Sequence, residues 1–351
     1  MSEKASYGPR SASHAKGRQK KPPQKPRKPA RWGRRIFFSL LIVLVGVALY
    51  LGYLVTQTRD ALEVIGDPTI VEVPPEQSVK VKGVTFLLLG LDSREKGGGL
   101  NTDVIKIVSM NPNTKSATVV SVPRDALIEM DGYISHKANA YYAKFYMQAI
   151  GDKQSPDDAR AYARSEMREM FGQYFDIPID YTAVINFDGF RDVVDALDGV
   201  TVDVDMDMCY IDNADGTNIQ LTAGTQQLDG KQALDYVRYR QSSSKCSPRT
   251  KESSDFERNK RQTQVIQAVM DEVTSLGVVT RVDGLLGAVG SNLKVDMPPK
   301  EIERLMTTYF GIGGSDIESV PLEGTWRSPY VRLDAETVEQ ARAALQRKLA
   351  E

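Results

Sequence analysis

Three short apolar runs with charged residues at their ends constrain the fold of this chain more than any other feature. The runs occupy residues 84–89, 104–110 and 117–122, and they end at Gly90, at Asn111-Pro112 and at Pro123. Short apolar runs bounded by glycine or proline are typical of β-strands rather than helices. We therefore predict three strands, close together in the chain, that present charged side chains at their ends.

Carboxylates and arginines occupy the ends of these predicted strands. They are Asp92 and Arg94 after the first strand, Asp103 before the second, and Arg124 and Asp125 after the third. If the strands lie side by side, these side chains share one rim of a sheet. Two carboxylates can hold a hard divalent cation that keeps several waters and a phosphate oxygen. Planar guanidinium groups bind phosphate by paired hydrogen bonds. The sequence therefore predicts a Mg²⁺ and diphosphate site at this rim.

A run of 21 uncharged residues, 36–56, precedes this region. At about 1.5 Å per residue, a helix of this length spans the ~30 Å hydrocarbon layer of a bilayer. Arg31, Arg34 and Arg35 flank its N-terminal side, so the positive-inside rule places the N-terminus in the cytoplasm and the remaining chain outside. A cleaved signal peptide is the alternative, but the run is long for one and no A-x-A-like site follows it. We expect an uncleaved signal-anchor helix in the cell membrane.

Charge and composition divide the rest of the chain. Residues 1–35 carry twelve Lys or Arg and one Glu, and because the formal net charge of all 351 residues is −1, the remainder carries about −12. A tail rich in proline and lysine cannot bury a core, so we expect 1–35 to be disordered and cytoplasmic. Basic residues beside a membrane helix are explained by topology and anionic lipid, so nucleic acid is not an expected partner. Residues 57–80 form a proline-containing stalk, and 81–350 form one extracellular domain.

Strand and helix patterns alternate through this domain, which predicts the α/β fold class. The expected architecture is a single domain, similar to three-layer folds, with a central mixed sheet behind the transmembrane helix. Beyond the opening strands, we predict helices over 138–150, 156–171, 187–197, 255–276, 298–310 and 335–349, a short helix from 228, and strands over 181–186, 200–204 and 317–321.

Two further arginine clusters occur later in the chain. The first is Arg238 and Arg240, whose spacing places both side chains on one face of an extended segment. The second opens a predicted helix, where an i, i+3, i+7 stripe and its neighbour are Asp255, Arg258, Gln262 and Arg261. Arginines at a helix start form a phosphate cradle, because the free N–H groups and the dipole also favour anions. The alternative is a solvated charged helix face, which two arginine clusters in an acidic body make less favourable.

Five blocks of this sequence resemble the signature of the LytR-CpsA-Psr family, in the right order and behind one N-terminal anchor. The blocks are Gly90-Leu-Asp92-Ser-Arg94, Thr102-Asp103, Ser121-Val-Pro-Arg124-Asp125, residues 228–240, and Arg258-x-x-Arg261-Gln262. The resemblance covers about residues 81–275. It implies a membrane-anchored enzyme that moves a secondary wall polymer, such as wall teichoic acid or capsular polysaccharide, from a polyprenyl diphosphate carrier to a peptidoglycan sugar hydroxyl. Polyprenyl phosphate would be released.

The resemblance also implies roles for single residues. The expected catalytic residues are the Mg²⁺-associated acids Asp92 and Asp103 and the diphosphate-binding Arg124, Arg238 and Arg240. The expected substrate-binding residues are Arg94, Asp125, Lys137, Asp255, Arg258, Arg261 and Gln262. The proton acceptor is open between Asp103 and Asp125. For the lipid tail, the candidate walls of an apolar groove are the aromatic helix around 141–146 and the stripe 187–197, both of which ordinary core packing also explains.

Some features depart from the family pattern. Asn101 stands where many members have arginine, and the loop 241–254 is longer than usual. This loop carries Cys246, which together with Cys209 lies outside the membrane in the predicted topology, where disulfides are permitted. Their spacing fits no metal pattern. A disulfide that ties the loop to the preceding strand is the preferred interpretation, and two free thiols are the alternative.

Two other functions remain open. A non-catalytic, membrane-anchored regulator that binds polyprenyl diphosphate or wall polymer would need the arginines but no metal. A polyprenyl diphosphate hydrolase would use water as the acceptor. Several enzyme classes are disfavoured, because the chain has only two histidines, His14 and His136, and lacks the G-x-S-x-G, GxxxxGK[ST] and H-E-x-x-H motifs.

Overall fold

The computed structural model describes residues 60–67, 73–91, 100–213, 216–274 and 292–351. The predicted tail, the predicted membrane helix and part of the stalk fall outside these ranges, as do Asp92 and Arg94. Within them, no helix is both long enough and apolar enough to cross a bilayer.

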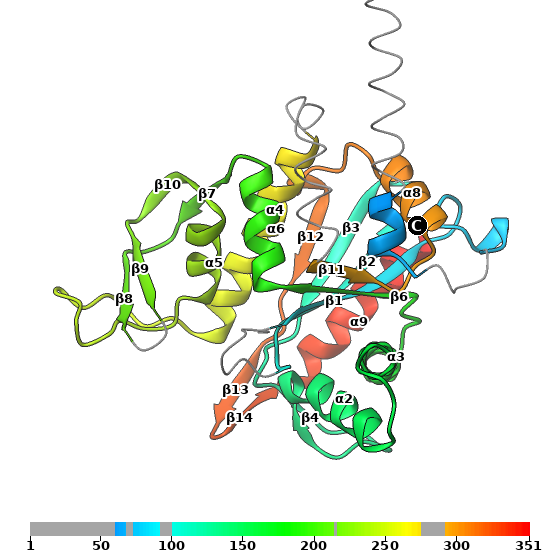
Figure 1. The fold of residues 1–351 in the computed structure, drawn as a ribbon, viewed down its shortest axis with the longest axis horizontal. Coiled ribbons are helices and arrows are strands. Elements are labelled where there is room, and N and C mark those ends of the chain that lie inside the picture. Colours follow the sequence, from blue (N-terminus) through cyan, green and yellow to red (C-terminus); the bar gives the residue numbers. More distant parts are fainter. Residues whose placement is uncertain (1–59, 68–72, 92–99, 214–215, 275–291) are drawn as a thin grey trace, which may run out of the picture. The chain divides into compact units, whose positions relative to one another are not determined.

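A six-stranded mixed sheet forms the centre of the domain (Figure 1). In spatial order its strands are β11 (Leu293–Val295), β6 (Tyr181–Asn186), β1 (Val84–Leu91), β2 (Thr102–Asn111), β3 (Ser116–Ser121) and β12 (Ile317–Val320). Strand β2 runs antiparallel to β1 and β3, whereas β6 is parallel to β1 and β12 is parallel to β3. The three opening runs are therefore adjacent strands, and the prediction of an α/β domain with a central mixed sheet is confirmed.

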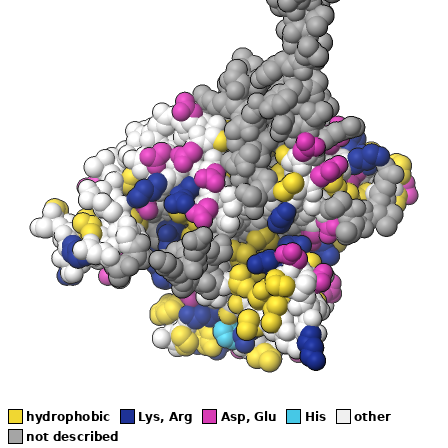
Figure 2. Space-filling model, in the orientation of Figure 1, with side chains coloured by type: hydrophobic (Ala, Val, Ile, Leu, Met, Phe, Trp, Pro, Cys, Tyr) yellow, Lys and Arg dark blue, Asp and Glu magenta, His cyan; other side chains and the backbone are white. Residues whose placement is uncertain are grey.

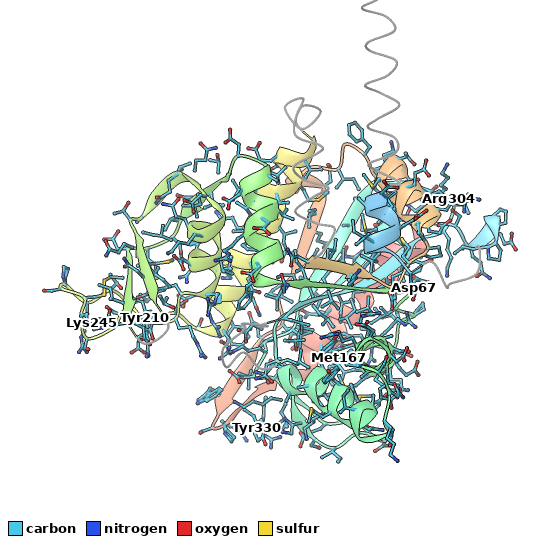
Figure 3. All side chains as sticks on the ribbon, in the orientation of Figure 1. Asp67, Met167, Tyr210, Lys245, Arg304 and Tyr330 are labelled. Atoms are coloured by element: carbon cyan, nitrogen blue, oxygen red, sulfur yellow. A yellow bond between two sulfur atoms is a disulfide. The ribbon has the colours of Figure 1, made fainter. Side chains whose placement is uncertain are left out.

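Three helices cover one face of the sheet (Figure 1). They are α2 (Tyr141–Gly151), α3 (Pro156–Phe175) and α9 (Ala335–Ala350). Side chains alternate along a strand, so Leu87, Ile105 and Ile107 point to this side and join one apolar cluster with helix residues. Met167 of α3 is fully buried within this cluster (Figure 3). Burial of this apolar surface stabilises the layer arrangement.

The other face of the sheet is covered by further helices. They are α4 (Phe187–Ala196), α5 (Gly230–Arg238), α6 (Asp255–Thr274) and α8 (Pro299–Thr308), and the first three shape the pocket described below. Helix α4, predicted over 187–197, is amphipathic. Its outer surface carries intermixed acidic and basic side chains (Figure 2), whereas Phe187, Phe190 and Val193 line the pocket. The sheet therefore lies between helices on both sides.

Helix α5 is fixed at its start by local chemistry. Asp229 and Gln232 form a capping box, in which each side chain accepts a hydrogen bond from the other residue's backbone N–H. At Gly230 a Cβ atom would lie 2.2 Å from the carbonyl oxygen of Arg191, so only glycine allows α4 and α5 to approach so closely. The helix ends at Arg238, and Tyr239 is extended, which separates Arg240 from the helix.

Short sheets complete the described part of the chain. The pairs are β4 (Leu127–Ile128) with β5 (His136–Lys137), β7 (Val200–Val204) with β10 (Gly224–Leu228), β8 (Met208–Asp212) with β9 (Thr217–Leu221), and β13 (Gly324–Arg327) with β14 (Tyr330–Leu333). Single 3₁₀ turns lie at Pro75–Gln77, Ala138–Ala140 and Gly314–Asp316.

A disulfide joins Cys209 of β8 to Cys246 of the loop 241–254, with Cα atoms 5.9 Å apart. The backbone N–H of Ile211 in β8 also donates to the hydroxyl of Ser243 in this loop at 3.0 Å. The backbone N–H of Ser253 donates to the carbonyl oxygen of Arg240 at 2.6 Å. The loop is thus held at both ends, next to the segment that carries Arg240.

Candidate active site

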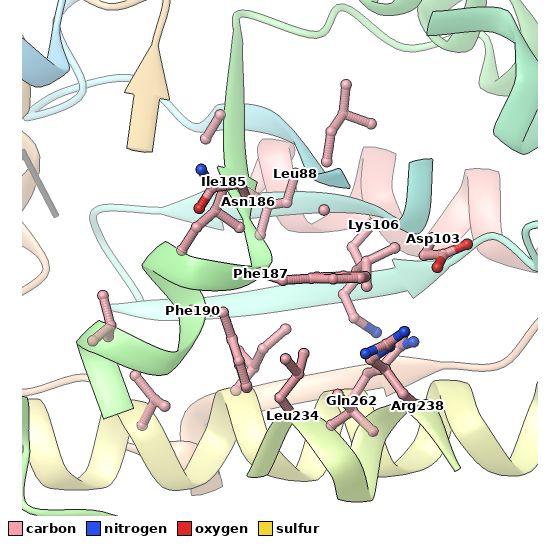
Figure 4. Close-up of a pocket in the computed structure, with 18 of the residues that line it drawn as sticks. Leu88, Asp103, Lys106, Ile185, Asn186, Phe187, Phe190, Leu234, Arg238 and Gln262 are labelled. Carbon is pink, nitrogen blue, oxygen red and sulfur yellow. The ribbon is translucent and has the colours of Figure 1, made fainter. Parts of the chain in front are cut away.

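A pocket of about 490 Å³ lies between the sheet and helices α4, α5 and α6 (Figure 4). Most of its wall is apolar. The apolar lining comprises Leu88, Leu89, Val104, Ala183, Ile185, Phe187, Phe190, Val193, Leu234, Val237, Ile266, Val269, Met270 and Leu293. Such a wall fits a hydrocarbon chain, because burying apolar surface is favourable at about 25 cal/mol per Å².

Asn186 lies beside Ile185 (Figure 4), and the other polar residues of the lining gather at one end of this pocket. They are Asp103, Lys106, Arg124, Arg238, Arg240, Arg258 and Gln262. Figure 4 shows Asp103, Lys106 and Arg238 on one side and Ile185 and Phe190 on the other. Five of the seven carry a basic group, against one carboxylate. The pocket therefore pairs an apolar end with a positively charged end, which suits an amphiphilic anion.

The arginines reach this end from three parts of the fold. Arg124 follows β3, Arg240 follows α5, and Arg258 lies in the first turn of α6. We predicted that they bind one diphosphate, because each lies beside the end of a predicted strand or helix. In the structure all three line one pocket. Arg238, the last residue of α5, lies with its guanidinium 4.7 Å from the ring centre of Phe187. This cation–π contact fixes Arg238 against α4.

The positive charges of the cluster disturb one another. Burial, followed by the charges of Arg240 and Arg124, lowers the pKa of Arg258 to about 9. Burial and the charge of Arg124 lower the pKa of Arg240 as well. The Nε atoms of Arg124 and Arg258 are buried and have no hydrogen-bond partner. A phosphate bound here would relieve the repulsion between these arginines.

Two carboxylates partly neutralise the cluster. Asp103 accepts a hydrogen bond of 2.7 Å from Nη1 of Arg124, and Asp255 forms an ion pair with Arg258. Asp255 does not line the pocket, so its contact with the pocket passes through Arg258. Among the described residues, no group of three or more His, Cys, Asp or Glu side chains is placed to hold a metal ion. Of the two predicted metal ligands, Asp92 lies outside the described residues, so the structure gives the position of Asp103 alone.

Asp125 and Lys137 form an ion pair beside the pocket rather than in its wall. The Nζ atom of Lys137 is 2.8 Å from Oδ1 of Asp125. Oδ2 of Asp125 lies 3.6 Å from Nε of Arg124, and Lys137 is also 5.8 Å from the ring centre of Trp326. Asp125 thus links Lys137 to Arg124.

Arg261 differs from its sequence-based interpretation as a substrate-binding residue. Its guanidinium binds both carboxylate oxygens of Asp205 at 2.8 Å and is 5.7 Å from the ring centre of Tyr236. It is 2% exposed and does not line the pocket. The hydrogen-bonding capacity of this side chain is used within the fold, because it lies on another face of α6 than Arg258 and Gln262.

The two helices considered as walls of the lipid groove lie on different faces of the sheet. Tyr141, Tyr142 and Phe145 of α2 belong to the core on the opposite face of the sheet, whereas the α4 stripe lines the pocket.

Sequence reasoning missed Lys106, which is fully buried at the charged end. The sequence contained a sign of this role. Lys106 shares one face of its strand with Val104 and Val108, and a lysine on such an apolar face is unexpected in a core.

Comparisons with known proteins show which family this chain resembles. A family model described as the LytR_cpsA_psr family matches residues 56–347. The polyisoprenyl-teichoic acid–peptidoglycan teichoic acid transferase TagU of Oceanobacillus iheyensis is 28% identical over 313 residues, covering 87% of this chain and 88% of its own. The enzyme of this type named TagT from Bacillus subtilis is 30% identical over 276 residues, covering 76% of each chain.

Solved structures show the same fold. The crystal structure of TagV from B. subtilis superposes with a TM-score of 0.58 at 26% identity, covering 77% of this chain and 98% of that chain. TagT bound to LI-WTA gives a TM-score of 0.56 at 26% identity, covering 81% and 96%. Since the family model spans most of the sequence, this chain belongs to the LytR-CpsA-Psr family.

Proposed function

We propose that this protein transfers a secondary wall polymer, such as wall teichoic acid or a similar anionic glycopolymer, from a polyprenyl diphosphate carrier to a sugar hydroxyl of peptidoglycan. The observation that carries the proposal is that one pocket has both an apolar end for a prenyl chain and an arginine cluster for a diphosphate. The relatives named as teichoic acid transferases support this substrate class.

The proposed reaction is an in-line phosphoryl transfer. The acceptor hydroxyl oxygen bonds to the polymer-side phosphorus, while the bond from that phosphorus to the bridging oxygen breaks. The electron pair leaves with the bridging oxygen, which becomes part of polyprenyl phosphate, and the hydroxyl proton passes to a base. Arg124, Arg240 and Arg258 stabilise the charge on the phosphate oxygens, which is the main source of catalysis in such reactions. Of the two candidate bases, only Asp103 lines the pocket.

We propose Mg²⁺ as the cofactor, with Asp103 and Asp92 as its protein ligands. A site with few carboxylates fits this ion, because Mg²⁺ usually keeps several waters and takes phosphate oxygens as further ligands. When bound, the ion would supply charge stabilisation on the diphosphate oxygens. The described residues fit this arrangement, since the Asp103 carboxylate lies among the phosphate-binding arginines.

We propose a single-pass topology with the N-terminus in the cytoplasm and the catalytic domain, 81–350, outside the membrane. The support is the uncharged run 36–56 and the arginines before it. A carrier with a prenyl tail stays in the bilayer, so an anchored enzyme and its donor substrate would share one surface.

The product assay separates this function from its rivals. The full chain in detergent is mixed with Mg²⁺, a synthetic polyprenyl diphosphate-linked saccharide and a peptidoglycan oligomer, and the products are identified by mass. We expect a phosphate-bridged conjugate together with polyprenyl phosphate. Polyprenyl phosphate and a saccharide phosphate without a conjugate would instead indicate a hydrolase. Binding without turnover, whatever the acceptor, would indicate a regulator.

A further inference from the structure

Lys106 is an unusual residue for the centre of a sheet. In the strand register it lies between Leu88 of β1 and Ser121 of β3, and its side chain has no exposed surface. Its amine donates to the hydroxyl of Ser121 at 2.6 Å and to the hydroxyl of Thr263 at 3.0 Å. Both partners are neutral, so no described carboxylate bonds to this buried amine to offset its charge.

A buried amine with neutral partners is costly to keep. Removing an ammonium from water disfavours its charged form, and burial lowers the pKa of Lys106 to about 7. Methionine or leucine would fill this position and retain the apolar packing at lower cost. Residues that reduce stability in this way are expected at functional sites.

The position of Lys106 within the pocket suggests its use. Lys106 lines the pocket, and Figure 4 shows its amine end directed toward the side where Arg238 lies. Across from it, the pocket-lining residues of α6 change from Arg258 and Gln262 to Ile266 one turn later, and Thr263 lies at this change. Lys106 therefore marks the junction of the charged and apolar ends.

We propose that Lys106 binds the lipid-side phosphate of the carrier, the phosphate that leaves as polyprenyl phosphate. This inference rests on the proposed function. If the prenyl chain fills the apolar end, the phosphate bonded to it lies at the junction, and the polymer-side phosphate lies among the arginines of the rim. During transfer, negative charge grows on the bridging oxygen of the leaving phosphate, where an ammonium group stabilises it.

The charges around Lys106 determine how its role depends on pH. The pocket-lining charged groups are Asp103 of β2, Arg124 after β3, Arg238 and Arg240 at the end of α5, and Arg258 of α6, whereas β1 and β6 contribute no charged group. Burial opposes protonation of Lys106, and a bound phosphate favours it. Ligand binding should therefore take up protons, and affinity should fall as pH rises from 7 to 9.

The test is the substitution Lys106→Met, with Lys348→Met as the matched control. Lys348 is also buried, but it lies on α9, donates to Ser116 and Glu351 at 2.8 and 2.7 Å, and does not line the pocket. Binding of farnesyl diphosphate and farnesyl phosphate to the full chain in detergent is measured by calorimetry. We expect Lys106→Met to weaken both ligands about ten-fold, as for loss of a charge-assisted hydrogen bond, and Lys348→Met to weaken neither.

Further measurements separate this role from a structural one. Lys106→Met should raise the thermal midpoint of the unliganded protein while it lowers affinity, and it should flatten the pH dependence of binding. A lower midpoint with unchanged affinity would assign Lys106 to the fold and overturn the inference. Normal binding by Lys106→Met beside loss of binding by Arg240→Ala would reject the inference and keep the proposed function. Normal binding by both variants would reject the proposed function as well.

Discussion

Arg258 shows how one side chain links the fold to the site. It is 6% exposed, pairs with Asp255 one turn earlier in α6, and lies near the charges of Arg240 and Arg124. A guanidinium with a pKa lowered to about 9 is held under repulsion, which its single carboxylate partner does not remove. The charge of Arg258 is therefore only partly neutralised within the fold, which leaves it able to bind an anion.

The first residue-scale prediction concerns Arg240→Ala. Because Arg240 supplies charge at the polar end of the pocket, we expect polymer transfer to fall by about 10²–10³-fold, as for loss of one preorganised donor. The folding midpoint should stay the same or rise, because a like charge near Arg124 and Arg258 is removed. Arg332→Ala is the control, since Arg332 pairs with Glu129 outside the pocket wall. Transfer by Arg240→Ala at the rate of the control would contradict the site.

The second residue-scale prediction concerns stability and pH. The pKa of Lys106 is lowered from 10.5 to about 7, so between these values the unfolded chain binds more protons than the folded one. The contribution of Lys106 to the free energy of unfolding therefore rises with pH between about 7 and 10.5. In urea denaturation, Lys106→Met should be more stable than wild type at pH 7, and the difference should shrink by pH 10. A difference that stays constant would mean that the amine does not titrate in this range.

Single residues were predicted unevenly from the sequence. Arg124, Arg238, Arg240, Arg258 and Gln262 all line the pocket, because turns and helix spacing set their directions. The pairing of Arg261 with Asp205 was not predictable, since it joins segments 56 residues apart through tertiary contact. Local spacing gives the direction of a side chain, and it does not identify the partner that side chain will meet.

At the scale of elements, the contact between α4 and α5 controls the pocket. We predict that Gly230→Ala destabilises the protein by about 1–3 kcal/mol, because the new methyl group would overlap the carbonyl of Arg191. Gly151→Ala is the control, since a Cβ at Gly151 meets no atom within 4 Å. Urea denaturation of both variants checks the prediction, and equal midpoints would contradict the close approach.

The disulfide supports a second element, the loop 241–254. Closing a loop of 37 residues stabilises a protein by about 3–4 kcal/mol in the chain-entropy model, so Cys246→Ser should lower the free energy of unfolding by that order. Because Ser253 holds the backbone of Arg240, ligand affinity should fall as well. Denaturation and binding measured with and without reductant test this. Wild type that is unaffected by full reduction would disagree with the expected contribution.

Elements with strong periodicity were predicted well, and short exposed pairs were not. The strand at 181–186 and the helix starting at 187 match β6 and α4, because apolar spacing distinguishes them. The hairpins β8–β9 and β13–β14 were missed, because they are short and carry several polar or exposed residues. Such pairs form through turns and tertiary contact rather than through a buried face.

At the scale of the whole molecule, one sheet separates two different interiors. The face covered by α2, α3 and α9 is a closed apolar core, whereas the face covered by α4, α5 and α6 contains the pocket. The sequence could not distinguish these faces, because aromatic residues in α2 and α4 look alike as candidate walls. Only the order of strands and the crossing of the helices decide which aromatic group is core.

The most direct test of the account uses a polyprenyl diphosphate that carries a photoreactive group in its first isoprene unit. After irradiation with the full chain in detergent, the modified peptides are identified by mass spectrometry. We predict labelling of residues on α4 and α6 near the charged end, such as Phe187 and Ile266, that is lost when excess unlabelled polyprenyl diphosphate competes. Labelling of Tyr141 and Phe145 on α2 instead would place the lipid on the other face of the sheet and contradict the proposed site.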